Sequence, residues 1–293
     1  MSNEEIAPKQ AETDRAKAVR NILPSLRDLF QVTDIKWADF AKDFILLVIN
    51  HVIRRQIEGI EAALDLASAN LGHLSVCFIR PSLEEMIWVK YLSSLAVDTS
   101  QRLLIALANY DGLRSLNAQR AYVGDEVMRD LWYTPEFLEA ARKKLPVVEA
   151  ELASLRKQLK WSGKTPSTDW IAKAVNEQRI YQYLHSATSR SLHFSAGEIF
   201  RRGWGHPRGI VTTDKPEFRV HLSEFALDKL WRLFFDTVWG AMPLISDAGI
   251  TSEDSLTDER LMPLLQTLLD LGLVPLVHAH EWNLTPDGPL NLS

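Results

Sequence analysis

The stretch from Arg179 to Gly209 concentrates side chains that can move protons or bind anions. It contains His185, His193 and His206 together with several arginines. Histidine titrates near neutral pH, and the arginine guanidinium binds phosphate and carboxylate groups. Such a mixture is typical of proton transfer beside an anionic substrate. The same residues would also suit a helix whose polar groups only stabilise a core.

Polar side chains recur along one face of the helix that this stretch predicts, over residues 177–202. The spacing of four, three, four and three residues puts them close to a common line on an α-helix. They are Arg179, Tyr183, Ser186, Arg190 and His193. An apolar stripe that includes Leu184 adjoins them, so we expect these polar groups to lie at the edge of the core.

A second polar face is predicted in a helix over residues 72–97. Arg80 and Glu84 are four residues apart there, which allows them to pair on one side of the helix. Charged groups at a core edge require partners, because an unpaired buried charge is strongly destabilising. We therefore predict that this face meets the face that carries Tyr183 and His193, forming one polar network.

Two interpretations of this network stay open. In the catalytic one, His193 is the acid or base, Glu84 orients it, Arg80 and Arg190 hold a phosphate, and Tyr183 belongs to the same centre. Ser186 would then help to bind the substrate. In the structural one, the network fixes the register of the helices and has no chemical role.

A basic group follows the predicted helix. Arg201, Arg202, His206 and Arg208 surround Trp204. Cations beside an aromatic ring are typical of a site that binds phosphate and stacks a base, which would suit RNA or a nucleotide. The alternative is that the arginines stabilise the carboxyl end of a helix while Trp204 fills the edge of the core.

The chain offers little for a metal or a cofactor. It has one cysteine, Cys77, which excludes an internal disulfide and a cysteine-based metal cluster. The motif His278-Ala279-His280-Glu281 lacks a third fixed ligand, and the glycines near 203–209 lack the spacing of a nucleotide-binding loop. We expect neither a metal site nor a cofactor.

Composition indicates a globular protein in a reducing compartment. The chain has 293 residues of which 46% are hydrophobic, enough to bury a sizeable core without disulfides. Its net charge of −5 gives no overall basic field, so contact with nucleic acid would need a local patch. The first residues are polar and the most apolar windows are short for a membrane span. We expect a cytoplasmic protein with no membrane partner.

Hydrophobic periodicity predicts an all-α fold, a multi-helix bundle with long antiparallel helices. The expected helices cover residues 15–31, 35–60, 72–97, 100–122, 135–160, 169–175, 177–202, 222–247, 258–272 and 274–281. A long ordered loop with a small strand pair is expected near 203–221. We predict a flexible leader over 1–14, a single domain over 15–282 and a tail over 283–293.

Three segments resemble a known bacterial family. They are RPSLEE at 80–85, WIAKAV at 170–175 and YQYLHSATSRSLHFS at 181–195, and they are similar to the domain of unknown function 5677 family. The resemblance implies that Arg80, Glu84, Tyr183, Ser186 and His193 are the characteristic polar positions.

The helical layout of that family is similar to HEPN-type domains, many of which are RNases or nucleotide-modifying toxins with an arginine and a histidine four to six residues apart. Arg179 with His185 and Arg201 with His206 have this spacing. The resemblance thus implies an RNA- or nucleotide-acting enzyme in phage defence or a toxin system.

The alternative function is a non-catalytic binding or adaptor bundle. Its polar cluster would be structural, and its partner would dock on the 203–221 loop. Tryptophans such as Trp132 and Trp239 are expected in the core, but several exposed together would mark a contact with a protein partner or a second copy in a homo-oligomer.

Overall fold

The fold comes from a computed structural model, which describes residues 12–30, 40–193, 195, 204–205, 211–212, 216–247 and 261–277. The chain divides into two compact units. Unit 1 contains residues 1–34, 49–86 and 179–293, and unit 2 contains residues 35–48 and 87–178. The single domain expected over 15–282 stays a prediction, because three of the helices contribute residues to both units.

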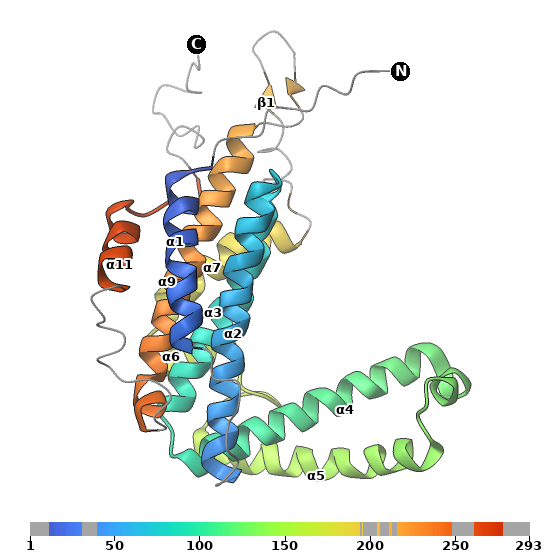
Figure 1. The fold of residues 1–293 in the computed structure, drawn as a ribbon. Helices are drawn as coiled ribbons and strands as arrows, with labels where there is room; N and C mark the ends of the chain where they lie inside the picture. Colours follow the sequence, from blue (N-terminus) through green and yellow to red (C-terminus); the bar gives the residue numbers. More distant parts are fainter. Residues whose placement is uncertain are drawn as a thin grey trace, which may run out of the picture. The chain divides into compact units, whose positions relative to one another are not determined.

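Unit 1 is built from helices drawn from both ends of the chain (Figure 1). Its elements are α1 (Asp14–Phe30), most of α2 (Phe40–Ser68), the 3-10 turn η1 (Gly72–Ser75), the first part of α3 (Val76–Ser93), α7 (Gln178–Leu192), α9 (Pro216–Asp247) and α11 (Leu261–Asp270). Helix α1 packs against both α9 and α11, and η1 packs against α9.

The core of unit 1 lies along α9. Phe225 and Phe234 on this helix are fully buried, and the ring of Phe234 meets that of Phe30 at 5.7 Å between centroids. Ile22 and Leu26 bring the apolar face of α1 into the same core. Burial of large apolar side chains supplies most of the stabilisation of such a bundle, roughly 1.5–3 kcal/mol for each.

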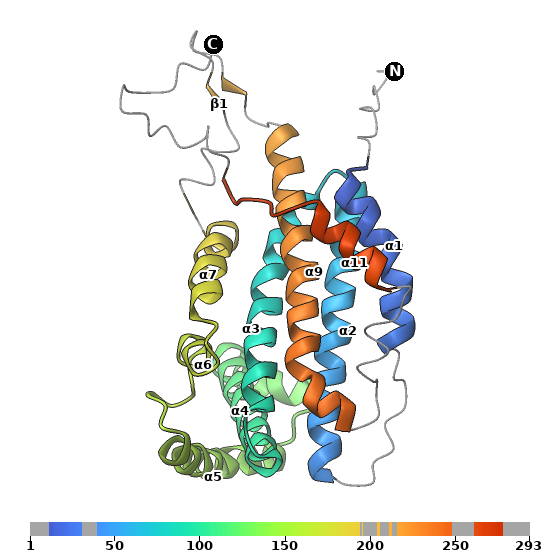
Figure 2. The same cartoon turned by 90° about the vertical axis from the view of Figure 1, so that its left-hand side faces the viewer.

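Unit 2 contains α4 (Val97–Asp130), α5 (Pro135–Leu159) and α6 (Thr168–Ala174), together with the second half of α3. Helices α4 and α5 form an antiparallel hairpin (Figures 1 and 2). Thr134 caps α5 by accepting a hydrogen bond from the backbone N–H of Phe137, and Pro135 occupies the first helical position, where proline is favoured. The sequence signal for this helix start is confirmed.

The predicted all-α class is confirmed, and the strand pair expected near 203–221 is present. Strand β1 (Trp204–Gly205) pairs antiparallel with β2 (Val211–Thr212). Part of the expected loop is wrong, however, since α9 already begins at Pro216. The segment was predicted as a loop because turn-forming residues are frequent in it. Pro216, however, stands in the first turn of the helix, where it needs no N–H partner.

Several other boundaries differ from the predictions. Helix α2 continues to Ser68 instead of ending near residue 60, and α4 continues to Asp130 instead of ending near 122. Helix α7 ends at Leu192, ten residues before its predicted end, and residues 274–277 are not helical. Apolar residues in the latter segment fit a helix period, but its backbone bonds to side chains of other elements. Among the described residues, the helices are all too short or too polar to cross a membrane.

Candidate functional site

The predicted polar network is not assembled as expected. Arg80 donates from Nε to Oε1 of Glu84 at 3.1 Å, so the predicted pair within α3 is confirmed. Within the described residues, neither side chain makes a hydrogen bond or ion pair with Tyr183 or His193. The two charges satisfy each other one helical turn apart and remain partly exposed, so they need no third partner.

The Tyr183 and His193 side chains are exposed, which corrects the expectation that they lie at the core edge. Tyr183 is 45% exposed, and its pKa is raised, chiefly by partial burial and to a smaller extent by the Asp228 carboxylate. A hydrogen bond with the Leu276 backbone opposes this rise. His193 follows the end of α7 and is exposed. The apolar stripe of α7 turned inward as predicted, but the polar line faces outward.

The remaining candidates on α7 stay separate as well. Ser186 is exposed and Arg190 is half-buried. Of the pair with arginine–histidine spacing, Arg179 is exposed, while the ring of His185 lies 5.1 Å from that of Tyr181. The described side chains of α7 therefore do not converge on one reacting position.

The predicted basic group falls largely outside the described residues. This is true of Arg201, Arg202, His206 and Arg208, as it is of the His278–Glu281 motif. For Trp204 the structure gives the backbone, which pairs with Thr212 across the two strands. The proposed phosphate-binding role of this group stays a prediction.

A buried charge cluster, which the sequence analysis missed, lies between α1 and α9. We define it as Arg15, Glu224, Asp228, Lys229 and Arg232. Asp228 is fully buried and accepts hydrogen bonds from three cations. Its Oδ1 atom bonds to Nη1 of Arg15 at 3.1 Å and Nε of Arg232 at 3.0 Å, while Oδ2 bonds to Nζ of Lys229 at 2.6 Å.

The cluster also fixes the segment that follows α11. Arg15, which is 3% exposed, bonds from Nη2 to the carbonyl oxygens of Leu271 and Gly272 at 3.2 and 3.0 Å. The N–H of Val274 bonds to Oδ2 of Asp228 at 3.3 Å. These bonds take the place of the helical ones that the sequence predicted for this segment. The cluster thus joins both ends of the described chain to α9.

The sequence contained a signal for three of the five residues of this cluster. Glu224, Asp228 and Arg232 recur every four residues in SEFALDKLWRLFF, a segment otherwise dominated by apolar residues. Charges on the inward face of a helix are expensive unless they are paired, so this pattern predicts a buried partner. That partner, Arg15, lies more than two hundred residues away, and no local pattern could identify it.

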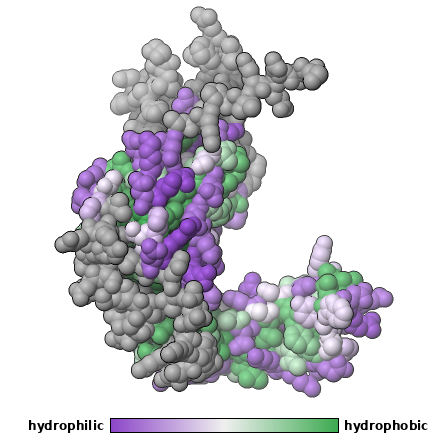
Figure 3. Space-filling view, in the orientation of Figure 1, coloured by the Kyte–Doolittle hydropathy of each residue, from purple (hydrophilic) through white to green (hydrophobic). Residues whose placement is uncertain are grey.

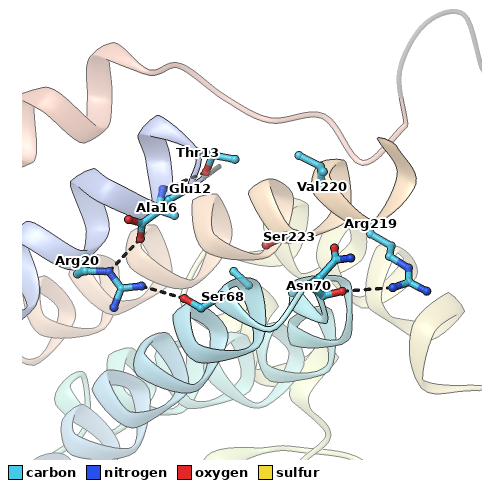
Figure 4. A pocket seen from close by; sticks show the side chains of 11 residues that line it. Glu12, Thr13, Ala16, Arg20, Ser68, Asn70, Arg219, Val220 and Ser223 are labelled. Atoms are coloured by element: carbon cyan, nitrogen blue, oxygen red, sulfur yellow. Dashed lines mark hydrogen bonds and ion pairs between the residues drawn. The ribbon is translucent and has the colours of Figure 1, made fainter. Parts of the chain in front are cut away.

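An open pocket lies beside the cluster, between α1, α9 and the turn that joins α2 to η1 (Figure 4). Its volume is about 310 Å³. The lining residues are Glu12, Thr13, Ala16, Arg20, Ala67, Ser68, Asn70, Gly72, Arg219, Val220 and Ser223, all in unit 1. Hydrophilic residues gather on the surface of unit 1 in this region (Figure 3). We refer to it as the polar pocket.

Two arginines line the polar pocket from different helices. Arg20 on α1 donates to Oε1 of Glu12 at 2.9 Å and to the hydroxyl of Ser68 at 3.2 Å. Arg219 on α9 donates from Nη1 to the carbonyl oxygen of Asn70 at 3.4 Å. A guanidinium has five N–H donors, so one arginine side chain can bond to the protein and to an anion at the same time.

The turn at the floor of the pocket depends on two special residues. Asn70 has a φ of +61°, in the left-handed region that asparagine tolerates, and it ends α2. The N–H of Leu71 bonds back to the carbonyl of Leu66 at 2.7 Å, closing the helix end. Gly72 is buried, and a Cβ there would lie 2.1 Å from Oγ of Ser223 and 2.7 Å from its Cβ. Only glycine lets α9 approach this closely.

The charge cluster positions one wall of the pocket. The Thr13 hydroxyl bonds to Glu224, which also accepts from Nε of Arg15 at 3.3 Å, and Oγ1 of Thr13 caps α1 by accepting from the N–H of Ala16. The first turn of α1, and with it Ala16 and Thr13, is therefore held against α9. A preorganised wall costs a ligand less ordering entropy on binding.

The pocket is suited to binding rather than to proton transfer. Its described lining includes neither histidine nor cysteine, and its one carboxylate, Glu12, is paired with Arg20. Within the described part of the chain, histidine, cysteine and acidic side chains do not gather in threes as a metal site would require. Guanidinium, hydroxyl and amide groups around a cavity are typical of anion recognition.

Comparisons with known protein families, with curated proteins and with solved structures found no match for this chain. The resemblance to the domain of unknown function 5677 family, and the HEPN-like character that it implies, therefore stay predictions. The geometry of the polar pocket is the basis on which a function is proposed.

Proposed function

We propose that this protein is a non-catalytic binding protein whose polar pocket takes a small organic anion, one that carries a phosphate or carboxylate group. The observation that carries the proposal is that Arg20 and Arg219, from helices at opposite ends of the chain, line the same cavity. With Glu12 as the one acidic residue in the described lining, the cavity has an excess of positive charge. Arginine is favoured for binding both of these anionic groups.

The size and the walls of the pocket limit the ligand. A volume of about 310 Å³ lies at the lower end of the range of roughly 300–1,000 Å³ for small-molecule sites. Ala16, Ala67 and Val220 supply a short apolar wall, and none of the described lining residues is aromatic. A base would find no ring on which to stack, so a short aliphatic body fits better than a nucleotide.

The enzyme alternative has less support. An acid–base catalyst must reach the reacting group within hydrogen-bond distance, usually beside an orienting partner. His193, to which that role was assigned, is exposed, and Glu84 pairs with Arg80 instead. An RNA- or nucleotide-acting enzyme stays a prediction that rests on the resemblance.

Isothermal titration calorimetry tests the proposal directly. The probes are glycerol 3-phosphate, succinate, inorganic phosphate and AMP, each titrated into the full chain at low salt, where charge interactions are least screened. We expect glycerol 3-phosphate or succinate to bind more tightly than AMP. Absence of binding by all four would contradict the proposal.

Charge-removing variants separate the pocket from long-range attraction. A hydrogen bond to a charged group is worth about 1.5–3 kcal/mol, so R20Q and R219Q should each weaken binding about 10- to 100-fold. R54Q on α2 is the matched control, because Arg54 is exposed and does not line the pocket. If R54Q weakened anion binding as much as R20Q and R219Q, the anion would bind elsewhere or be held only by the general electrostatic attraction of the protein.

A cleavage assay addresses the enzyme alternative. The binding proposal predicts that purified protein does not cleave RNA, and that H193Q changes neither this result nor the free energy of unfolding by more than about 0.5 kcal/mol, as is usual for an exposed residue. Cleavage that H193Q abolishes without altering stability would favour the enzyme and overturn the non-catalytic assignment.

A further inference from the structure

The hairpin of α4 and α5 is held together along one narrow seam. On α5 the inward residues are spaced three and four apart, as in a coiled coil. They are Leu138, Ala141, Leu145, Val148, Leu152 and Leu155, and most of them are buried. On α4, Leu103, Ala106 and Tyr110 are buried at matching intervals. Arg102 adds an ion pair to Glu151 at 2.7 Å across the two helices.

Beyond Tyr110 the core of the hairpin narrows to a few buried residues, chiefly Met128, Leu138 and Ala141. None of the residues from 111 to 127 is buried, although all belong to α4. The helix is also interrupted in this part, since Gly124 has a φ of +82° and a non-helical ψ. Two helices that pack only on each other bury little apolar surface, and isolated helical hairpins are marginal in water. We define residues 111–147 as the outer hairpin.

Large apolar side chains are exposed on the outer hairpin. Tyr122 is 91% exposed, Trp132 93% and Phe137 51%, with Val127, Leu131 and Val147 also exposed. Figure 3 shows hydrophobic and hydrophilic residues side by side on this hairpin. The three aromatic side chains offer roughly 350–590 Å² of surface per copy, if each contributes in proportion to its exposure. A standard stable interface buries about 800 Å² per partner, so they would supply about half of it or more.

The charges of the outer hairpin indicate what covers it. Positive and negative residues are equal in number. They are Arg114, Arg120, Arg129, Arg142, Lys143 and Lys144 against Asp111, Asp125, Glu126, Asp130, Glu136 and Glu139. Several already pair locally, as Arg120 does with Asp125 at 2.5 Å and Arg142 with Glu139 at 2.8 Å. A nucleic acid or an anionic membrane would require an excess of basic residues. A surface with both signs is complementary to itself in a two-fold contact.

We propose that the outer hairpin is a dimerisation surface, which pairs with the same segment of a second copy of this chain to form a four-helix contact. Tyr122 and Trp132 are its central anchors, since exposed tyrosine and tryptophan dominate the binding energy of protein interfaces. The second copy supplies the apolar cover that residues 111–127 lack. Four-helix packing of two hairpins is a common way to complete such a core.

Sedimentation equilibrium of the full chain between 1 and 100 µM, read together with two variants, tests the dimer. We expect the wild type to dimerise in this range and the double variant Y122S/W132S to weaken dimerisation at least about 100-fold. W239S is the matched control, because Trp239 is also an exposed tryptophan but lies on α9. It should leave the dimer unchanged.

Three results would overturn the proposal: a wild type that stays monomeric at 100 µM, a dimer that Y122S/W132S leaves intact, or a dimer that W239S breaks. Should the double variant lose helical structure, amide hydrogen exchange of the wild type decides the question. Protection of residues 111–127 must then rise with protein concentration. Exchange that does not depend on concentration would contradict the dimer.

Discussion

Arg15 and Arg20 stand five residues apart on α1, yet they lie in opposite environments. Arg15 is buried and divides its donors among Asp228, Glu224 and two carbonyl oxygens. Arg20 is 46% exposed and bonds to Glu12 and Ser68 at the rim of the polar pocket. Burial, rather than residue type, decides which arginine is structural. A buried guanidinium must have its partners for the chain to fold, while an exposed one gains little from them and can exchange them for a ligand.

The largest effect is expected from D228N in the charge cluster. It removes the charge that Arg15, Lys229 and Arg232 share, which leaves Glu224 as the remaining acidic partner of Arg15 in the cluster and takes the cluster's counterion from Lys229 and Arg232. The free energy of unfolding should fall by about 3–5 kcal/mol, measured by urea denaturation. D65N on α2 is the control, since Asp65 is exposed, and it should change stability by less than about 0.5 kcal/mol. A loss below about 1 kcal/mol for D228N would show that the cluster is not structural.

A smaller loss in the free energy of unfolding, about 1–3 kcal/mol, is expected from G72A at the floor of the pocket. The added Cβ would overlap Ser223, and a serine Cβ cannot rotate out of the way. The double variant G72A/S223G removes the overlap and should recover stability, apart from the cost of about 1 kcal/mol for glycine inside a helix. Both variants are compared by urea denaturation. If G72A and G72A/S223G lost the same amount of stability, the contact between residue 72 and Ser223 would not be what limits the approach of α9 to this turn.

In its degree of burial, Glu85 is intermediate between Arg15 and Arg20. Burial raises the pKa of its carboxyl, against the attraction of Arg55 and a hydrogen bond from Gln56, and nearby Glu84 adds to the rise. A carboxyl whose pKa is higher in the folded state contributes stability below its unfolded pKa and loses it as the pH rises through the folded pKa.

The wild type should therefore lose stability relative to E85Q as the pH rises above the ordinary pKa of a glutamate and the Glu85 carboxyl ionises. Urea denaturation of both proteins at several pH values measures the difference, which we expect to be the smallest of these effects. Asp65, exposed on α2, again provides the control, since D65N should show no such trend. A wild type that became more stable relative to E85Q as the pH rises would contradict this prediction, because it would mean that folding lowers the pKa of Glu85.

A feature could be predicted from the sequence when the residues that form it lie close together in the chain. Helices follow from the spacing of apolar residues a few positions apart, and the start of α5 follows from Thr134 and Pro135, so the all-α class was accessible. The inward turn of Leu184 on α7 was predicted for the same reason. These features depend on neighbours in the sequence.

The functional geometry could not be predicted in the same way. Arg20, Asn70 and Arg219 belong to segments separated by up to two hundred residues, and no local pattern relates them. The face with Tyr183 and His193 was wrongly placed at the core edge, because a stripe of polar residues next to an apolar one can point either inward or outward. Only the packing of a helix against its neighbours decides between these directions.

The measurement that tests this account most directly is the free energy of unfolding of R15Q and R20Q, compared by urea denaturation in one buffer without ligand. We predict that R15Q loses about 2–4 kcal/mol, because Asp228 and Glu224 lose a buried partner. R20Q should lose less than about 1 kcal/mol, as expected for an exposed ion pair. Equal losses, or a larger loss in R20Q, would contradict the division between a structural and a ligand-binding arginine on α1.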